Sequence, residues 1–386
     1  MDSIYKLCQA FHPWAVEVRR ALHAHPEISG HELRTQEAIA AYLTELGIPC
    51  RKAAKTGLIA ELGSERPGKT VVIRADIDAL PLADACGKPY QSQNAGACHA
   101  CGHDGHTAIA LGAAKVLAAL ADERCGTFRF LFQPREEAFP SGAVDLIADG
   151  ALEGADSVIG AHIWQPLPLG VIGISCGALM ASPDKFTITV QGRGGHGSMP
   201  QQSVDPILTA AQIIVALNTV ISRSLDPLAA GVLSVGSVHS GEAFNIIPDS
   251  AVIEGTVRSF DESVRQTVFK RIREIAAGIC AAHGARCEVD SLFGHPPVIN
   301  DETVALQVEQ AAALCQSGAR PQRALPVMCG EDFSYYLHER PGAFFLIGTG
   351  TEECVWPHHH PKFDIDELCL LHGMEVMARA ALQLAR

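Results

Sequence analysis

The sequence predicts a two-domain α/β protein, in which a smaller βαββαβ unit is inserted into a domain with a mostly parallel sheet. The 386 residues are 47% apolar, a chain longer than one hydrophobic core usually serves. Short β-rich runs alternate with helical patterns in the first half, as in layered α/β domains. Near residue 183 this pattern gives way to strict alternation of apolar and polar residues.

The first domain is expected to comprise residues 1–182 and 293–386. Its strands should be buried runs, and an Ala-rich helix should cover one face of the sheet. The expected strands are Gly57–Leu62, Thr70–Ala75, Phe128–Gln133, Val158–His162 and Ala343–Gly348, and the expected helices are Gly105–Leu120 and one that starts at Asp366.

The second domain is expected at residues 183–292, where Phe186, Ile188 and Val190 alternate with polar residues. Aspartate caps and a stop glycine bound its helices. The segments are a helix opened by Asp205-Pro206, strands Gly231–His239 and Ala251–Arg258, a helix from Asp261 to Gly284, and strand Ala285–Asp290. This order is the ferredoxin-like arrangement. The helix Ile207–Ile221 is apolar on more than one side, which fits either a partner subunit or burial in the monomer.

Composition argues against several classes of partner. The net charge of −13 has no compensating basic block, and pairs such as Arg19-Arg20 are expected on solvated helix faces, so neither nucleic acid nor a membrane is an expected partner. Thirteen scattered cysteines indicate reduced thiols, and the first residues do not resemble a signal peptide. The most apolar stretches, 108–121 and 207–221, are expected to fall short of a membrane span. We therefore expect a soluble cytoplasmic protein.

The segment Cys98–His106 carries six potential metal ligands within nine residues. Cys101 and His103 can face one ion if Gly102 forms a tight turn. The alternative is a structural zinc knuckle built on Cys98 and Cys101. A closed knuckle needs a second close pair of ligands, and no other C-x-x-C occurs in the chain. The pattern therefore favours an open, catalytic site.

Three successive predicted strands end in polar residues. Asp76 and Asp78 follow the first, Glu136 and Glu137 the second, and His162 ends the third. The carboxyl ends of strands in an open α/β sheet face the ligand crevice, and adjacent carboxylates can divide the roles of metal ligand and general base. Each signal alone also fits a turn cap, a solvated acidic pair or a satisfied polar histidine. Together they indicate a metal site.

The histidine run His358-His359-His360 near the C-terminus could supply one further ligand. A loop cluster without a metal is the alternative.

Taken together, these motifs resemble the M20 metallopeptidase family, and in particular its amidohydrolase branch of hippurate hydrolases, N-acyl-L-amino-acid amidohydrolases and auxin-conjugate hydrolases. The resemblance covers nearly the whole chain. It is carried by Leu22–Glu27, Arg74–Pro81, His99–His106, Gln133–Glu137, Gly192–Pro200, Phe244–Asp249, Gly255–Phe260 and His359–Asp364.

The resemblance implies two divalent metal ions per subunit, which could be zinc, manganese, cobalt or nickel. The implied ligands are Cys101, His103, Glu137, His162 and His359, with His360 as the substitute for the last. Glu136 matches the general base. Asp78 matches an acid that supports the site without binding the metal.

The resemblance also implies that residues 183–292 form a lid that mediates a homodimer or higher homo-oligomer. In the lid, His196 would reach a substrate oxygen, often in the partner's active site, and Asn245 and Arg258 would hold substrate; an arginine suits a carboxylate. Two positions depart from the family pattern. Cys98 replaces a usual methionine, and Ala138-Phe139-Pro140 replaces a stretch that is commonly glycine-rich.

The expected function is hydrolysis of the amide bond of N-acyl amino acids, such as hippurate-like or N-acetyl conjugates, by metal-activated water. A dipeptidase or aminopeptidase on the same two-metal core is one alternative, and a non-catalytic metal- or metabolite-binding protein is another. A thiol oxidoreductase using Cys98 and Cys101 is also conceivable, although the adjacent histidines favour metal.

Overall fold

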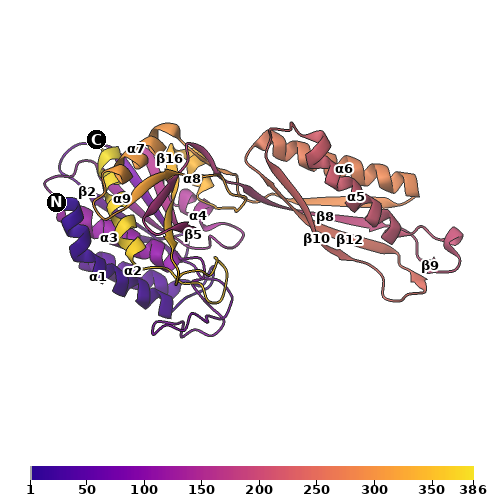
Figure 1. Cartoon of the computed structure of the whole chain (residues 1–386), viewed down its shortest axis with the longest axis horizontal. Coiled ribbons are helices and arrows are strands. Elements are labelled where there is room, and N and C mark those ends of the chain that lie inside the picture. The colour runs from indigo at the N-terminus through magenta and orange to yellow at the C-terminus, as the bar shows by residue number, and fades with distance from the viewer. Residues whose placement is uncertain (1) are drawn as a thin grey trace. The chain divides into compact units, whose positions relative to one another are not determined.

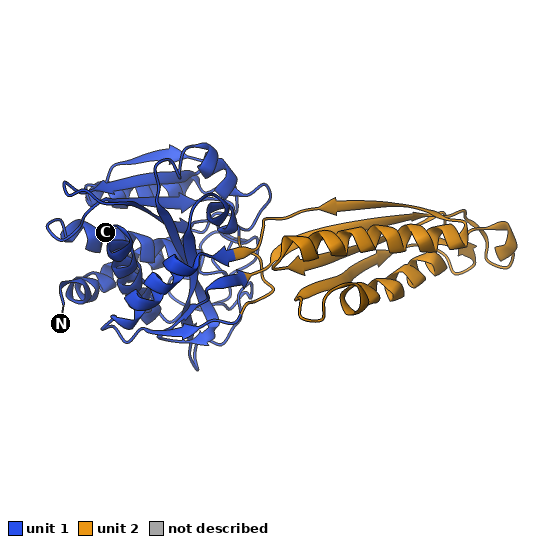
Figure 2. Ribbon diagram, turned by 90° about the horizontal axis from the view of Figure 1, so that it is seen from above, with its two compact units in different colours: residues 1–179, 299–325, 332–386 blue, residues 180–298, 326–331 orange. Residues whose placement is uncertain are grey.

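The computed structural model describes residues 2–386, which divide into two compact units (Figure 2). Unit 1 comprises the residues up to Leu179, with Ile299–Leu325 and Asp332–Arg386; unit 2 comprises Met180–Val298 and Pro326–Glu331. The short return at 326–331 belongs with unit 2 because Val327 forms a β-bridge with Met180, and the carbonyl of Cys329 accepts the Ala181 N–H at 2.9 Å.

Unit 1 is built on an eight-stranded mixed sheet in the order β1-β2-β4-β3-β5-β16-β6-β15. The four central strands β4, β3, β5 and β16 run parallel, as do β6 and β15, whereas the other neighbours are antiparallel. The strands are β1 Cys50–Ala53, β2 Gly57–Gly63, β3 Thr70–Asp76, β4 Thr127–Gln133, β5 Ser157–Pro168, β6 Val171–Ile174, β15 Arg320–Arg323 and β16 Gly342–Gly350. A separate pair joins β7 Gly177–Met180 to β14 Val298–Asn300. The predicted α/β class with a mostly parallel sheet is confirmed.

Helices from both ends of the chain pack together on this sheet. Helices α1 Ser3–Ala24, α3 His103–Ala119 and α9 Leu368–Leu384 contact one another, so the indigo and yellow ends of the chain lie side by side (Figure 1). Fourteen of the 17 residues of α3 are buried, so the helix is enclosed on more than the single apolar face that its sequence predicted. The remaining helices are α2 Leu33–Glu45, α4 Gly142–Ala148, α7 Glu302–Ala313 and α8 Ser334–Glu339.

The expectation that Arg19 lies on a solvated helix face is wrong. Its side chain is 1% exposed and forms ion pairs with Asp104 and Asp364, whereas the neighbouring Arg20 is 49% exposed. A single sequence shows that two arginines are adjacent on a helix but not that one of them faces buried carboxylates.

Unit 2 has the element order β-α-β-β-α-β and an antiparallel sheet ordered β10-β12-β8-β13, with helices α5 and α6 packed together on one face (Figure 1). The elements are β8 Ser182–Gln191, α5 Pro206–Ser224, β10 Gly231–His239, β12 Ser250–Ser259, α6 Glu262–His283 and β13 Arg286–Leu292. The predicted caps are present: Asp205 and Asp261 accept N–H groups of the first turns, and Gly284 is left-handed. A small ladder joins β9 Gly195–His196 to β11 Ile246–Ile247, and a 3₁₀ turn covers Pro200–Gln202.

Helix α5 has two apolar sides. Ala210, Ile213 and Leu217 are buried in the core of unit 2, whereas Leu208 and Val215 are 51% and 72% exposed. Among the helices in residues 2–386, α5 alone is long and apolar enough to cross a membrane. In its most apolar 18-residue stretch, 28% of the residues are buried. The prediction that residues 207–221 are too short or too polar for a membrane-spanning helix is therefore not confirmed by length and composition. The core helix of a soluble protein passes the same test.

Candidate metal centre

The start of helix α3 brings the first two candidate ligands together. Gly102 has φ +91°, a left-handed conformation that glycine adopts without strain, and it caps the helix that begins at His103. The predicted tight turn at Gly102 is present. The Cys101 thiol on one side of the turn and the His103 imidazole on the other, together with His162, offer ligand atoms that all lie within 4.8 Å of one another.

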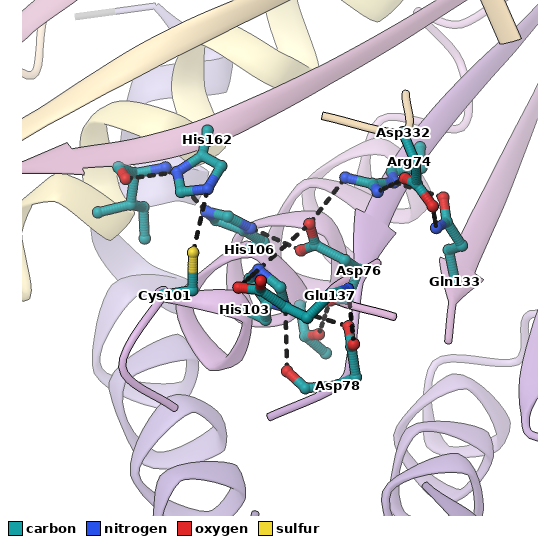
Figure 3. A network of polar contacts seen from close by, with 12 residues as sticks. Arg74, Asp76, Asp78, Cys101, His103, His106, Gln133, Glu137, His162 and Asp332 are labelled. Atoms are coloured by element: carbon teal, nitrogen blue, oxygen red, sulfur yellow. Dashed lines mark hydrogen bonds and ion pairs between the residues drawn. The ribbon is translucent and has the colours of Figure 1, made fainter. Parts of the chain in front are cut away.

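His162 lies in the middle of β5 rather than at the strand end predicted from the sequence, and it faces this turn. Sγ of Cys101 lies 3.5 Å from Nε2 of His162, a residue of β5 (Figure 3). Nδ1 of His162 lies 2.7 Å from the carbonyl oxygen of Ile163, so this nitrogen carries the proton and Nε2 presents a lone pair. Burial lowers the pKa of His162 well below its usual range, and the ring is therefore neutral, as a metal ligand must be.

The acidic pair that follows β4 lies at the same place. His103, Glu136 and Glu137 offer ligand atoms within 4.8 Å of one another, and so do Cys101, Glu137 and His359. Oε1 of Glu137 lies 3.1 Å from Nε2 of His359 and 4.0 Å from Nε2 of His103. The structure therefore brings together all five residues predicted as ligands and the predicted base.

Of the three C-terminal histidines, His359 is the one that meets Glu137. Its backbone N–H donates to the carbonyl of Ala100 at 2.8 Å, which ties this loop to the cysteine–histidine turn. His358 instead lies 2.9 Å from the carbonyl of Ile163, and the ring of His360 stacks on Trp356 at 4.3 Å. The geometry thus favours His359 over His360.

Asp78 connects two of these residues. Nδ1 of His103 lies 2.9 Å from the backbone oxygen of Asp78 and 3.2 Å from its Oδ1, and Oδ2 accepts the backbone N–H of Glu137 at 3.1 Å (Figure 3). The hydroxyl of Ser29 donates to the same Oδ2 at 2.6 Å. Hydrogen bonds of this kind hold a ligand histidine in one tautomer and orientation.

A buried charge network continues behind the site. Nη1 of Arg74 contacts Asp76 at 2.8 Å, and Nη2 contacts Asp332 at 2.6 Å (Figure 3). Asp76 also lies 2.6 Å from Nδ1 of His106, whose Nε2 accepts the N–H of Ile163 at 2.8 Å. Both nitrogens of His106 are thus used within the protein.

The electrostatics of the site favour a cation. Burial raises the pKa of the Cys101 thiol well above its usual range, and the charges of Glu137 and Glu136 raise it further. Burial also opposes a charge on His103, but the nearby carboxylates of Asp76 and Asp78 outweigh it and raise its pKa to about 10. Carboxylates, a thiol and imidazoles gathered in one buried place are costly unless positive charge compensates them.

Two buried atoms test whether the residues present fit metal ions. Nε2 of His103 is buried without a hydrogen-bond partner, and the buried Oε1 of Glu137 has the ion-pair contact with His359 but no well-oriented hydrogen bond. Buried polar atoms are nearly always partnered, and these two face the other candidate ligands. The donor set of one thiolate, three imidazoles and carboxylates therefore fits divalent metal ions.

The three predicted substrate-binding residues all lie in unit 2. His196 is exposed in β9, and its Nδ1 accepts the N–H of Ser198 at 3.1 Å. The carbonyl of Asn245 accepts the Gly197 N–H at 2.9 Å, so His196 and Asn245 are neighbours. Arg258 is near the other end of β12, paired with Pro183.

Sequence patterns missed part of the site. Asp332 was not singled out, although Glu331-Asp332 is an adjacent acidic pair like Glu136-Glu137. Asp332 is fully buried, and its Oδ2 accepts hydrogen bonds from Ser141 at 2.6 Å and Gln133 at 2.7 Å. The adjacent acids Glu331 and Asp332 could have indicated this residue, but they do not follow a predicted strand, which was the criterion that singled out Glu136 and Glu137.

Comparison with known proteins decides the family. The profile of peptidase family M20/M25/M40 matches residues 72–383, most of the chain. The chain belongs to this family. N-acetyl-L-cysteine deacetylase of Bacillus subtilis is 42% identical over 370 residues, covering 96% of this chain and 88% of that protein. N-acyl-L-amino acid amidohydrolase of Geobacillus stearothermophilus is 46% identical over 300 residues, covering 78% and 81%.

The fold agrees with this family. A solved Bacillus subtilis structure, described as a dinuclear metal-binding peptidase of the M20 family, superimposes with a TM-score of 0.86 at 38% identity, covering 98% of this chain and 99% of that one. The predicted M20 membership is confirmed, and the relatives support a metal-dependent hydrolase that acts on amide bonds.

Proposed function

We propose that this M20 protein hydrolyses the amide bond of N-acyl amino acids and releases a carboxylic acid and a free amino acid. The observation that carries this proposal is the convergence of five candidate ligands with Glu136 in one partly buried site. The names of the deacetylase and amidohydrolase relatives support an acylated amino acid as the substrate class.

In the proposed site, Cys101, His103, Glu137, His162 and His359 hold two divalent ions. When bound, the ions supply Lewis acidity, which lowers the pKa of a bound water and polarises the amide carbonyl. Glu136 takes the proton of the attacking water and returns it to the nitrogen of the leaving amine. Asp78 holds His103 and the backbone of Glu137 in position. The thiol and imidazole donors suit zinc, cobalt or nickel, and manganese remains a candidate because availability often decides which metal is bound.

We propose that unit 2 is a ferredoxin-like lid that completes the active site of a second chain. Strand β12 has ten residues and is therefore about 30 Å long. Asn245 lies five residues before the start of β12, whereas Arg258 is the ninth residue of that strand and lies near its other end. His196 and Arg258 are thus too far apart within one unit to hold the same small substrate. A homodimer resolves this, because one chain can supply Arg258 while its partner supplies His196 and Asn245.

The surface of unit 2 offers two features for such a dimer. The outer side of α5 exposes Ile207, Leu208 and Val215, an apolar surface of the kind found at subunit interfaces. Strand β10 is an edge of the sheet and is open to pairing with another chain. A cytoplasmic location is consistent with all thirteen cysteines being free.

A peptidase is the second candidate, because the solved M20 relative is described as a peptidase. A dipeptidase or aminopeptidase requires a free α-amine next to the scissile bond, whereas the proposed activity requires an acylated one. Dipeptides and their N-acetylated counterparts therefore discriminate the two candidates.

The test is hydrolysis of acetyl, benzoyl and longer acyl amino acids by metal-loaded wild-type protein and by Glu136→Gln. We expect activity in the wild type and a loss of about 10²–10⁴-fold in the variant, with its metal content unchanged. Glu352→Gln, a change at an exposed site, is the matched control and should keep full activity. Full activity in a metal-loaded Glu136→Gln protein, or no activity of the wild type on the panel, would refute the proposal.

A further inference from the structure

A second cluster of metal-ligand side chains lies apart from the candidate metal centre. It consists of His23, in the last turn of α1, with Asp84 and Cys86 from the loop after β3. Their ligand atoms, an imidazole nitrogen, a carboxylate oxygen and a thiol sulfur, all lie within 4.8 Å of one another. None of the three belongs to the ligand set proposed above.

The separations within the cluster match a tetrahedral ion. Nε2 of His23 lies 3.3 Å from Oδ2 of Asp84, and Sγ of Cys86 lies 3.6 Å from the same oxygen. Metal–ligand bonds of about 2.0–2.3 Å at tetrahedral angles place ligand atoms roughly 3.3–3.8 Å apart. Both observed separations fall in that range.

The histidine is oriented as a ligand histidine usually is. Nδ1 of His23 lies 2.7 Å from Oδ2 of Asp104, which in turn accepts a hydrogen bond from Nε of Arg19 at 2.8 Å. Nε2 therefore faces Oδ2 of Asp84, 3.3 Å away, and it is fully buried without a well-oriented hydrogen bond. A carboxylate on one ring nitrogen and a metal on the other is the common arrangement at protein metal sites.

The surroundings stabilise positive charge at this point. Burial opposes a charge on His23, yet the Asp104 and Asp84 carboxylates outweigh it and raise its pKa to about 10. A proton at Nε2 compensates these acids when no ion is bound. The side chains of His23 and Asp84 are 0% and 1% exposed, whereas Cys86 is partly exposed and gives an ion a way in.

The loop is already folded around the cluster. Oδ1 of Asp84 accepts the backbone N–H of Cys86 at 2.9 Å, and Oδ2 accepts that of Ser92 at 2.8 Å. The charge of Asp84 also raises the pKa of the fully buried Cys98 thiol, after the larger effect of burial itself.

We propose that His23, Asp84 and Cys86 form a third metal site, which binds a thiophilic divalent ion such as Zn²⁺ and clips the end of α1 to the loop after β3. One thiolate, one imidazole and one carboxylate suit zinc or cobalt and disfavour magnesium, calcium and manganese.

The number of bound ions tests this proposal. Wild-type protein, Cys86→Ser and His23→Gln are loaded with Zn²⁺ and dialysed, and bound zinc per chain is measured. We expect each variant to bind one equivalent fewer than the wild type. Cys50→Ser, which replaces another partly exposed thiol outside the cluster, should bind as much zinc as the wild type. Equal zinc in the wild type and in Cys86→Ser overturns the proposal.

Thiol reactivity gives a second readout that does not depend on enzymatic activity. Alkylation of each cysteine is followed by peptide mass spectrometry with and without Zn²⁺, in a Cys101→Ser, His103→Gln background that disables the first site. Bound zinc should slow alkylation of Cys86, because a coordinated thiolate is a poor nucleophile, and should leave Cys50 unchanged. Equal rates at Cys86 with and without zinc would contradict the third site even if the first site proved to bind no metal.

Discussion

Oδ2 of Asp78 accepts the backbone N–H of Glu137 at 3.1 Å, so a residue that follows β3 fixes the main chain that follows β4. Its other oxygen lies 3.2 Å from Nδ1 of His103, at the start of α3. One carboxylate therefore sets the positions of two candidate ligands from different elements. Removing the Asp78 carboxylate should therefore weaken metal binding as well as disturb the local fold.

We expect Asp78→Ala to lower metal affinity by about 10–100-fold, as is common when a residue that orients a ligand is removed. Competition with a chelator of known affinity measures this. Ser29→Ala removes one hydrogen bond to Asp78 and should have a smaller effect in the same direction. Unchanged affinity in Asp78→Ala would show that His103 and Glu137 do not need this support.

The buried pair Arg74–Asp332 should matter for stability. Asp332→Ala leaves the guanidinium of Arg74 buried without the Asp332 carboxylate, and breaking such a pair costs about 3–5 kcal/mol. Unfolding by urea measures the change in the free energy of unfolding. Asp332→Asn keeps the shape and part of the hydrogen bonding, and should cost less than the alanine variant. A loss below about 1 kcal/mol in Asp332→Ala would indicate that water or other groups replace the lost carboxylate.

His295 should make unit 2 less stable as the pH falls. Burial lowers the pKa of His295 to about 4, below the usual 6.5. Between those values the unfolded chain binds a proton that the folded chain does not, so stability decreases as pH falls, by up to about 1.4 kcal/mol per pH unit. Urea unfolding of the wild type and of His295→Gln at pH 7 and pH 5 tests this. The wild type should lose more stability than the variant, and equal losses would refute the prediction.

Mixing two inactive variants tests whether active sites are shared between chains. His196→Ala and Arg258→Ala should each be inactive as homodimers. After unfolding and refolding together, half of the sites in a mixed dimer have an intact Arg258 and an intact partner histidine, so about a quarter of wild-type activity should return. If both residues act within one chain, the mixture stays inactive. Mixing either variant with itself is the control.

The motifs predicted the candidate site well because its ligands gather at positions with a physical signature. Gly102 permits the turn that aims Cys101 and His103, and Glu137 follows the carboxyl end of β4, whereas His162 lies in the middle of β5 and not at its end as predicted. The fold class followed from periodicity, and the capped helices of unit 2 were predicted nearly to the residue.

Residues that pair over long distances in the chain were not predictable. Arg19 contacts Asp104 and Asp364, which are 85 and 345 residues away, and local periodicity carries no information on such pairs. Asp332 likewise meets Arg74 across 258 residues. The cluster of His23 with Asp84 and Cys86 was equally unpredictable, because its members come from a helix and a distant loop that share no sequence motif.

The ring nitrogens turned away from the candidate centre are already engaged: Nδ1 of His103 by Asp78, and Nδ1 of His162 by the Ile163 carbonyl. Ion capture therefore needs little ordering of the chain, in contrast to small zinc domains that fold only around their metal. After chelation the emptied enzyme should remain folded, and returning metal should restore activity within the mixing time rather than over the course of a refolding reaction.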